Sequence, residues 1–344
     1  MDLDCKNTLS FDDVLLQPLY SDIKSRTEVD IGNNLDSKTR LTLPVIASPM
    51  DTISGPAMAA AMHKYGGMAI VHRYNTIREQ ADIIERTTQN DEHALVGAAI
   101  GVTGEYLNRA AAIVAAGTRI LCLDIAHGHH ALMERALKTL RELYGDSIHL
   151  MAGNVATLEA FDDLANWGAD SIRVGIGGGS ICSTRIQTGH GIPTLQSIID
   201  CSTSTTKAKI IADGGLKSSG DIVKALAAGA DFAMVGSLLA GTIQTPGDTI
   251  YGSDNKRYKT YRGMASKDAQ MDWRGRAASL EGVSTVIPAK GDVKEVLSGL
   301  ERGIRSGLSY SGSRSITELQ AKAAFVQQSA AGQYESRPHI LERA

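Results

Sequence analysis

Residues 149–176, HLMAGNVATLEAFDDLANWGADSIRVGI, form one strand–helix–strand unit. The apolar run His149–Asn154 precedes Leu158–Trp167, whose apolar residues recur with helical spacing. Gly168-Ala169-Asp170 then ends the helix directly before a second apolar run, Ser171–Ile176. Near-continuous apolar runs joined by a helix are typical of parallel strands that are buried on both faces.

The same alternation occurs eight times in the first two-thirds of the chain. Further helical segments are Tyr106–Ala116 and Asp221–Ala228. Eight strands that alternate with helices predict an α/β fold, a parallel (β/α)8 TIM barrel that forms a single domain over residues 1–344. The predicted strands are Val45–Met50, Gly67–His72, Val96–Gly101, Arg119–Asp124, His149–Asn154, Ser171–Ile176, Lys209–Gly214 and Phe232–Gly236.

Two long connections interrupt this repeat. One follows the sixth strand and has the glycine and cysteine content of a catalytic loop, and the other, about residues 241–291, follows the eighth strand. Long structureless connections in a barrel are usually lids, so we expect 241–291 to be a flap. We expect Asp292–Arg305 to be the last barrel helix and about 306–344 to be a polar tail, in which Leu308–Tyr310 and Ala323–Val326 make core or subunit contacts.

Composition narrows the class of protein. The formal net charge of −3 gives no field that would favour nucleic acid or an anionic membrane, so neither is an expected partner. The four cysteines are scattered without a paired spacing, which is typical of a reduced protein. The N-terminus lacks an apolar signal core and no stretch is long enough to span a membrane. These features predict a cytoplasmic protein.

The loop 174–193, VGIGGGSICSTRIQTGHGIP, is the strongest functional signal. Glycines let backbone amides approach an anion or a flat ring, and Cys182 follows them on the loop after a buried strand. A thiol in such a setting is a candidate nucleophile, which favours an enzyme that forms a thioether with a phosphate-bearing substrate. The alternative is an inert buried thiol, which is the interpretation we give to Cys122. Cys5 and Cys201 carry no motif.

Polar residues follow the predicted strands, at the end of a barrel where chemistry takes place. They could also be helix caps. Loops after the seventh and eighth strands commonly hold phosphate. His127, His129 and His130 lack a further ligand and are interpreted as ordinary loop residues. The polar strand ends are Ser48, Asp51, His72, Asp124, Asn154, Gly177, Asp213 and Gly236-Ser237; the predicted phosphate ligands are Ser180, Gly215, Gly236, Ser237 and Tyr261, with Asp213 and Asn154 suited to a ribose.

Several motifs together resemble the inosine monophosphate dehydrogenase and guanosine monophosphate reductase family. They are Leu9-Ser-Phe-Asp-Asp-Val-Leu-Leu16, Ser48-Pro-Met-Asp-Thr52, Asp124-Ile-Ala-His-Gly128, Ala152-Gly-Asn-Val155, the cysteine loop, Ala212-Asp-Gly-Gly215, Gly236-Ser237 and Tyr261-Arg-Gly-Met264. The resemblance covers nearly the whole chain. It implies a purine mononucleotide substrate whose C2 is attacked by Cys182, a nicotinamide cofactor, and a homotetramer.

The resemblance also implies roles for individual residues. It adds Ser48, Met50, Gly263 and Met264 to the substrate-binding set, and it places Asp124, Arg73 and Gly175 beside the cofactor. The carbonyls of Gly177, Gly179 and Cys182 resemble a ring that holds a monovalent cation, K⁺, in the dehydrogenases. This chain departs from the family at Gly178, where the family usually has proline.

The same resemblance includes features that distinguish the dehydrogenases from the reductases. Only enough chain for a helix lies between His72 and Val96, where the dehydrogenases generally carry a regulatory insertion. Residues 265–280 lack the Arg-Tyr pair with which the dehydrogenases activate water, and Arg274 and Arg276 are poor bases. Thr184 and Glu281 resemble the reductase pair that assists loss of ammonia, a general acid role. Ser25-Arg-Thr-Glu-Val-Asp30 and His72-Arg73 are also reductase-like.

The resemblance thus predicts an NADPH-dependent GMP reductase with Cys182, Thr184 and Glu281 as catalytic residues. One motif favours a dehydrogenase instead. Tyr334-Glu-Ser336 resembles a cation-binding segment of the dehydrogenases that a neighbouring subunit supplies. Two alternatives stay open: an IMP dehydrogenase that lacks the regulatory domain and uses NAD, and a catalytically inactive regulator that binds purine nucleotides.

Overall fold

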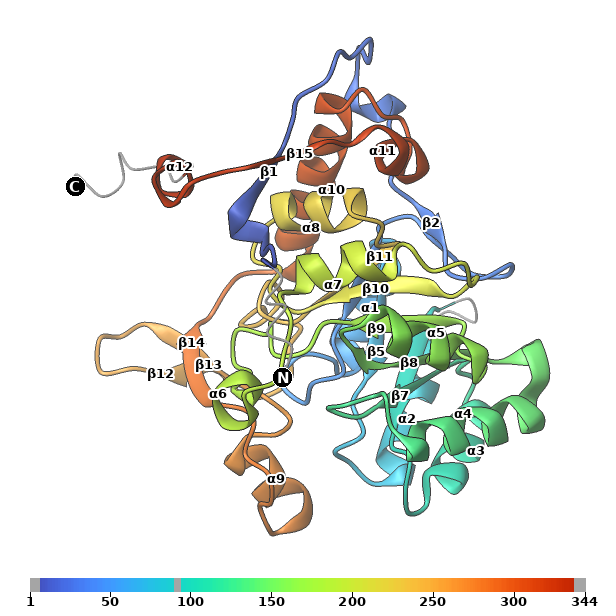
Figure 1. The fold of residues 1–344 in the computed structure, drawn as a ribbon. Coiled ribbons are helices and arrows are strands. Elements are labelled where there is room, and N and C mark those ends of the chain that lie inside the picture. The colour runs from blue at the N-terminus through green and yellow to red at the C-terminus, as the bar shows by residue number, and fades with distance from the viewer. Residues whose placement is uncertain (1–6, 90–93, 337–344) are drawn as a thin grey trace.

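The computed structural model of the protein describes residues 7–89 and 94–336 (Figure 1). Its centre is a closed barrel of eight parallel strands in the order β10-β11-β4-β5-β6-β7-β8-β9. Each of the eight predicted apolar runs coincides with one of these strands to within a few residues at its end, so the (β/α)8 prediction is confirmed. The strands are β4 (Val45–Ala47), β5 (Met68–Val71), β6 (Val96–Ile100), β7 (Ile120–Asp124), β8 (His149–Val155), β9 (Ser171–Val174), β10 (Lys209–Asp213) and β11 (Phe232–Val235).

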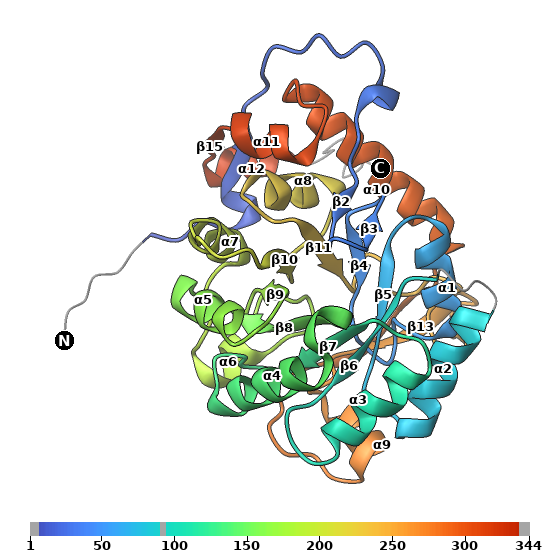
Figure 2. The ribbon, with the colours of Figure 1, turned by 90° about the vertical axis from the view of Figure 1, so that its right-hand side faces the viewer.

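Helices surround the barrel and bury their apolar faces against it (Figures 1 and 2). Helix α5 is representative: the Thr157 side chain caps its first turn, and Ala160, Phe161 and Leu164 are buried. The helices are α1 (Pro56–Lys64), α2 (Ile77–Gln89), α3 (Tyr106–Ala115), α4 (Ala131–Tyr144), α5 (Leu158–Asn166), α7 (Thr194–Cys201), α8 (Ser219–Ala227) and α10 (Val293–Tyr310). Short helical turns are η1 (Phe11–Asp13), η2 (Arg26–Glu28) and η3 (Gly145–Ser147).

A hairpin closes the end of the barrel that lies opposite the predicted site. Its strands, β2 (Asn33–Asn34) and β3 (Arg40–Leu41), pair antiparallel, and Leu35 and Leu41 join an apolar cluster of inward-facing strand residues that includes Cys122 and Phe232. The barrel is therefore a packed core with one closed end.

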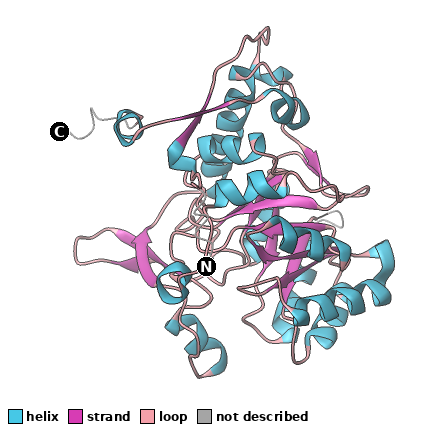
Figure 3. Cartoon of the chain, viewed as in Figure 1, coloured by secondary structure: helices cyan, strands magenta, loops and turns pink. Residues whose placement is uncertain are grey.

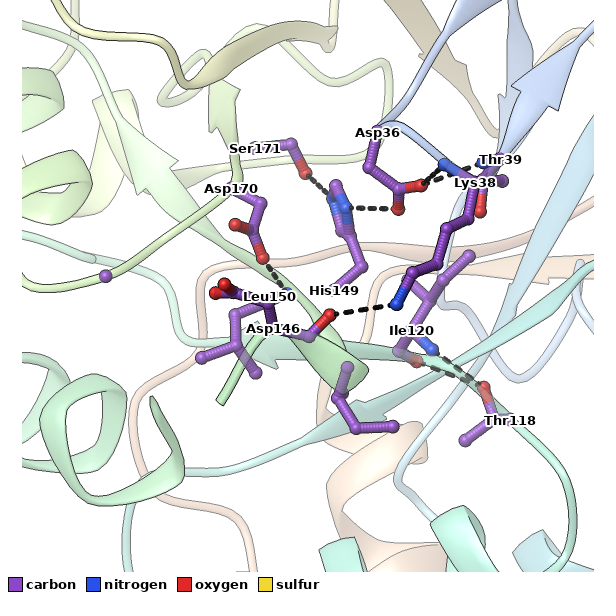
Figure 4. A network of polar contacts seen from close by, with 12 residues as sticks. Asp36, Lys38, Thr39, Thr118, Ile120, Asp146, His149, Leu150, Asp170 and Ser171 are labelled. Atoms are coloured by element: carbon purple, nitrogen blue, oxygen red, sulfur yellow. Dashed lines mark hydrogen bonds and ion pairs between the residues drawn. The ribbon is translucent and has the colours of Figure 1, made fainter. Parts of the chain in front are cut away.

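A buried histidine links this hairpin to the barrel (Figure 4). His149 at the start of β8 bonds through Nδ1 to Asp36 Oδ2 at 3.0 Å and through Nε2 to Ser171 Oγ at 2.8 Å. Partial burial works to raise the pKa of Asp36, but hydrogen bonds from His149 and from the Lys38 and Thr39 amides outweigh it and lower that pKa to about 2. The carboxylate form of Asp36 is thus the form that the fold stabilises.

The flap differs from the structureless connection predicted for residues 241–291. It contains a three-stranded antiparallel sheet, β12 (Ile250–Tyr251), β13 (Arg257–Arg262) and β14 (Ser284–Pro288), together with helix α9 (Lys267–Arg274) (Figure 3). The prediction was wrong because it rested on the glycines and charged residues of this segment and did not consider alternation between the two faces of a strand. In β13 the side chains of Lys259 and Tyr261 are buried, while those of Tyr258, Thr260 and Arg262 are more exposed. This is the alternation of a half-buried strand.

The C-terminal segment is also more ordered than the predicted tail. Helix α10 continues past Arg305 to Tyr310, and α11 (Ile316–Lys322), β15 (Phe325–Gln327) and α12 (Ala330–Glu335) follow it. Strand β15 pairs antiparallel with β1 (Val14–Leu16), and α12 stands away from the barrel (Figure 1). Of the expected contacts, Leu308 is buried and Phe325 packs against the core, whereas Tyr310 is exposed.

Among the described residues, no helix combines the length and apolar character that crossing a membrane requires.

Replacing Asp36 by asparagine tests the link between hairpin and barrel. We expect Asp36→Asn to lower the free energy of unfolding at neutral pH, because the variant lacks the charge that His149 and the two amides stabilise. The native pKa of Asp36 lies below its ordinary value, so its contribution is present above about pH 4 and is lost as the pH falls toward 2. The difference between wild type and variant, measured by urea denaturation, should therefore shrink below pH 4. Glu142→Gln on the exposed face of α4 is the control, and an equal, pH-independent effect of both variants would contradict the prediction.

Candidate active site

A cavity of about 350 Å³ opens at the carboxyl ends of the barrel strands, beneath the flap. Its volume lies within the range of ligand sites. Every residue predicted to bind substrate, cofactor or cation, or to act in catalysis, lines this single cavity. These residues are Ser48, Met50, Arg73, Asp124, Asn154, Gly175, Gly177, Gly179, Ser180, Cys182, Thr184, Asp213, Gly215, Gly236, Ser237, Tyr261, Gly263, Met264 and Glu281.

A hydrogen-bonded chain joins Cys182, Thr184 and Glu281. The Cys182 thiol donates to Thr184 Oγ1 at 3.1 Å, and the Thr184 hydroxyl donates to Glu281 Oε2 at 2.8 Å. Thr184 is the first residue of α6 (Thr184–Thr188), and Glu281 comes from the flap. A proton that leaves the sulfur therefore has a continuous path to a carboxylate.

Backbone hydrogen bonds hold the cysteine loop and the flap together. The Ser183 amide donates to the Glu281 carbonyl at 2.9 Å, and the Val283 amide donates to the Ile181 carbonyl at 2.9 Å. Cys182 and Gly282 form an antiparallel bridge between these two bonds. The distance from sulfur to carboxylate is thus fixed by backbone geometry and does not depend on side chains alone.

Cys182 differs in accessibility from the other described cysteines. It is partly exposed in the cavity, whereas Cys122 and Cys201 are buried. Burial raises the pKa of both buried thiols to about 12, so they stay protonated and unreactive. This agrees with the interpretation of Cys122 as a core residue. Cys5 lies outside the described residues.

Arg173, which the sequence analysis missed, links two of the carboxylates of the cavity, those of Asp124 and Asp213. Its guanidinium donates to Asp213 Oδ2 through Nε at 3.0 Å and through Nη2 at 2.8 Å, and to Asp124 Oδ1 through Nη1 at 2.5 Å. Burial opposes the charge on Arg173, but Asp213 and Asp124 outweigh it and raise its pKa well above the ordinary value. The signal in the sequence was a lone arginine inside the apolar run Ser171–Ile176.

Asn154 on β8 also holds the Asp213 carboxylate. Its Nδ2 donates to Asp213 Oδ2 at 2.8 Å and to the Gly175 carbonyl at 2.9 Å. The bonds that Asp213 accepts from Arg173 and Asn154 all reach its Oδ2, and none of them uses its Oδ1. Asp213 is thus held in one orientation with one oxygen available for a ligand.

Close backbone contacts shape the other end of the cavity. Gly214 has φ +94°, and a Cβ there would lie 3.0 Å from the Gly179 amide nitrogen, so only glycine lets these two loops meet. Ser180 Oγ and Tyr261 OH face each other at 3.3 Å. Burial raises the pKa of Tyr261, which therefore stays a neutral hydroxyl able to donate a hydrogen bond.

Two of the polar strand ends, Asp51 and His72, do not line the cavity. Asp51 Oδ2 accepts from Nε and Nη2 of Arg262 at 2.9 and 2.6 Å, which attaches flap strand β13 to the barrel. Burial lowers the pKa of His72, so its ring is neutral. Asp51 therefore supports the flap from outside the cavity lining, and the His72 carbonyl accepts from Asn75 and Gln80 in the loop and helix that follow β5.

Two histidines of the loop 127–130 contact other groups of the protein. His129 Nε2 contacts Asp163 Oδ2 at 2.8 Å, and the His130 ring caps α4 by accepting from the Leu132 amide. No group of three or more potential metal-ligating side chains occurs within residues 7–89 and 94–336.

Comparison with known proteins agrees with this arrangement. Residues 8–339 match the family described as "IMP dehydrogenase / GMP reductase domain". The chain belongs to this family.

Similar members of the family include both dehydrogenases and a reductase. The chain is 31% identical over 473 aligned positions to inosine-5'-monophosphate dehydrogenase of Nitrosopumilus maritimus, covering 98% of this chain and 99% of the relative. It is 31% identical over 474 positions to inosine-5'-monophosphate dehydrogenase of Bacillus subtilis, covering 98% and 96%. The crystal structure of a variant of GMP reductase from Trypanosoma brucei, in complex with guanosine 5'-monophosphate, is similar with a TM-score of 0.91, 29% identity and 98% coverage of each chain.

The alignments to the two dehydrogenases extend over more positions than the 344 residues of this chain. These relatives therefore contain segments that this chain lacks. In this chain residues 72–95 connect β5 to β6, and α2 lies within the described part of this connection.

Removing the guanidinium of Arg173 tests its linking role. We expect Arg173→Met to lower the free energy of unfolding by up to about 3–5 kcal/mol, because two partly buried carboxylates lose their common buried partner. Arg173→Lys keeps the charge but cannot reach both carboxylates, so its effect should be intermediate. Urea denaturation measures both, with Arg135→Met on the exposed face of α4 as the control. Equal stability of Arg173→Met and Arg135→Met would contradict this account.

Proposed function

We propose that this protein is a GMP reductase, which converts GMP to IMP and ammonia with NADPH through a covalent bond to Cys182. The observation that carries the proposal is the hydrogen-bonded chain Cys182–Thr184–Glu281. It offers a proton path suited to expelling an amine. Residues 265–280 contain no Arg-Tyr pair for activating water. The similarity to a GMP reductase that binds guanosine 5'-monophosphate supports the same choice.

In the proposed complex the phosphate lies at the end of the cavity formed by the loops after β10 and β11. Gly215, Gly236, Ser180 and Ser237 supply amides and hydroxyls there, and the neutral Tyr261 hydroxyl donates from the flap. The free Oδ1 of Asp213 accepts a ribose hydroxyl. These contacts direct the base toward Cys182, beside Met50 and the flap residues Gly263 and Met264.

The proposed chemistry begins at the sulfur. The Cys182 thiol loses its proton along Thr184 to Glu281, and the sulfur bonds to C2 of the purine. The bond between C2 and the exocyclic nitrogen breaks, and Glu281 returns the proton so that nitrogen leaves as ammonia. A thioimidate on Cys182 remains, with atoms and charge in balance.

The residues beside Cys182 fit a nicotinamide cofactor, the class that this family uses. Arg73 Nε is buried without a hydrogen-bond partner, and it faces Asp124 Oδ2 at 3.7 Å. We infer that Arg73, Asp124 and Gly175 hold the nicotinamide end. When bound, the reduced nicotinamide would supply hydride to C2, which releases IMP and the thiolate.

A potassium ion fits the cysteine loop poorly. The Gly179 carbonyl already accepts from the Cys182 amide at 3.1 Å. The Arg185 side chain packs against Gly177 and donates to the Ile176 and Ile192 carbonyls, which brings a fixed positive charge beside the predicted ligands. A second cation there would be repelled, so no step of the proposed reaction uses one.

A second candidate, IMP dehydrogenase with NAD, is favoured by the names of the relatives that are about one-third identical. The hydrogen bonds that join Cys182, Thr184 and Glu281 argue against the third candidate, an inactive regulator. A homotetramer and a cytoplasmic location remain predictions.

The assay that tests the proposal mixes the purified protein with GMP and NADPH and follows the absorbance band of the reduced nicotinamide. We expect that band to disappear as IMP and ammonia form in equal amounts, and we expect Cys182→Ser to abolish the reaction. Reduction of NAD in the presence of IMP, without turnover of GMP, would assign the dehydrogenase activity instead. Binding of the nucleotide without either reaction would favour the third candidate, an inactive regulator.

The proton path predicts a specific loss on changing its members. We expect Thr184→Val and Glu281→Gln each to lower kcat by about 10²–10⁴-fold, because each interrupts general acid–base transfer. Binding of GMP, measured by calorimetry, should change little. Thr188→Val, one turn further along α6, is the control. Near-normal kcat in both path variants would rule out the proposed role of the chain.

A further inference from the structure

The loop 174–193, which carries Cys182, is closed by a side chain from its own middle. Arg185, in the first turn of α6, donates from Nη2 to the Ile176 carbonyl at 3.2 Å and to the Ile192 carbonyl at 2.6 Å. Ile176 and Ile192 also form an antiparallel bridge, so they mark the place where the two ends of the loop meet. Arg185 thus ties the middle of the loop to both of its ends.

Two glycines make room for this side chain. Gly177 and Gly191 have φ of +77° and +149°. A Cβ on Gly177 would lie 2.5 Å from Arg185 Cγ, and a Cβ on Gly191 would lie 2.7 Å from Arg185 Nε. Any other residue at either position would displace the arginine, because packed atoms do not approach so closely. The Arg185 side chain therefore occupies a space that the missing Cβ atoms of these glycines leave.

Thr194, the first residue of α7, limits the loop from another side. A Cβ on Gly178 would lie 2.5 Å from Thr194 Oγ1, a buried hydroxyl with no hydrogen-bond partner among the described residues. Proline carries a Cβ, so the residue that the family usually has at this position would collide with Thr194 in the present shape of the loop. The loop shape of this chain is therefore specific to glycine at 178.

The groups that Arg185 contacts are of the kind that binds a monovalent cation. Potassium is held in proteins by backbone carbonyl oxygens that replace its hydration shell. Here a guanidinium brings positive charge to carbonyls of the same loop, through N–H groups that donate to them. Arginine keeps its charge at every physiological pH, so this contact is permanent.

The tether acts on the catalytic groups through the backbone. Arg185 directly follows Thr184, whose hydroxyl links the Cys182 thiol to Glu281. The amide of Ser183, between the two, donates to the Glu281 carbonyl. Releasing Arg185 would therefore shift Thr184 and Cys182 relative to the flap. A displacement of reacting groups by about 1 Å can lower a rate by about 10²-fold.

We propose that Arg185 is a positioning residue that takes the place of the monovalent cation implied by the resemblance to the dehydrogenases, so that the reaction of this chain does not require K⁺. The charge that a bound ion would bring to the loop comes from a side chain of the loop itself. The inference rests on the proposed function only in that Cys182 is the nucleophile, which both the reductase and the dehydrogenase would require.

The dependence of the rate on K⁺ tests the proposal. We expect the wild type to turn over GMP with NADPH equally fast in K⁺ and in N-methylglucamine, a cation too large for a ring of carbonyls, at equal ionic strength. In Arg185→Met, which keeps an apolar stem without the charge, kcat should fall by about 10²-fold while the KM for GMP changes less. Gln187→Ala, on the same short helix, is the control and should keep the wild-type rate. Activation of the wild type by K⁺ would overturn the proposal.

Rescue separates the charge of Arg185 from a purely structural role. The residue is exposed, so small cations can reach the space that Arg185→Ala leaves. We expect K⁺ or methylguanidinium to restore part of the rate lost in that variant. Arg185→Lys, which keeps a charge, should retain more activity than Arg185→Met. If neither cation restores activity to Arg185→Ala and Arg185→Lys is no better than Arg185→Met, the charge has no role and the proposal fails.

Hydrogen–deuterium exchange tests the tether without any reaction. We expect the amides of residues 174–193 to exchange faster in Arg185→Met than in the wild type, because the middle of the loop loses its bonds to the ends. Added K⁺ should leave this exchange unchanged in the wild type and slow it in Arg185→Ala. Equal exchange of this loop in the wild type, Arg185→Met and Arg185→Ala would contradict the tether.

Failure of this inference can be distinguished from failure of the proposed function. Turnover of GMP with NADPH that K⁺ strongly accelerates would overturn the role of Arg185 and leave the reductase assignment intact. Reduction of NAD in the presence of IMP at a rate independent of K⁺, together with faster exchange of the loop in Arg185→Met, would overturn the reductase assignment and leave the role of Arg185 intact.

Discussion

The buried guanidinium of Arg173 is the interaction on which the mouth of the barrel depends. It lies between Asp124 on β7 and Asp213 on β10, and the residue is only 7% exposed. Two carboxylates this close would repel each other without it. Because both carboxylates are fixed by the same group, the positions proposed for ribose and for nicotinamide are set together. The cavity is thus organised before any ligand arrives.

The barrel was predictable from the sequence because its signal is repetitive. Each strand is a short apolar run buried on both faces, and most of the barrel helices end at glycine, as α5 does at Gly168-Ala169-Asp170 before β9. The convergence of the candidate residues follows from the same geometry, since parallel strands bring their carboxyl ends to one side. Contacts such as Thr184–Glu281 span nearly a hundred residues, and only the resemblance to a family pointed to that pair.

The errors have physical causes. The flap was taken as structureless because its strands are short and polar, yet β13 gains partners on both sides, from β12 and β14. Arg173 was missed because the apolar run identifies a strand but not the partner of a charge within it, and buried charges persist when they are paired. Trp273 in α9 of the flap stacks on Tyr74 in the loop after β5, and no local pattern in the sequence connects these two segments.

The pairing of β1 with β15 has a consequence for the ends of the chain. Residues 14–16 and 325–327 close the polypeptide into a ring, with the entire barrel between them. Removing either end of the chain would leave the strand at the other end without its partner, as an open β edge. The unpaired strand would carry Leu15 in β1 or Val326 in β15, which are 39% and 43% exposed even when the two strands are paired. Such edges recruit foreign strands. Shortened forms of the protein would therefore tend to self-associate through a surface that the intact chain keeps occupied.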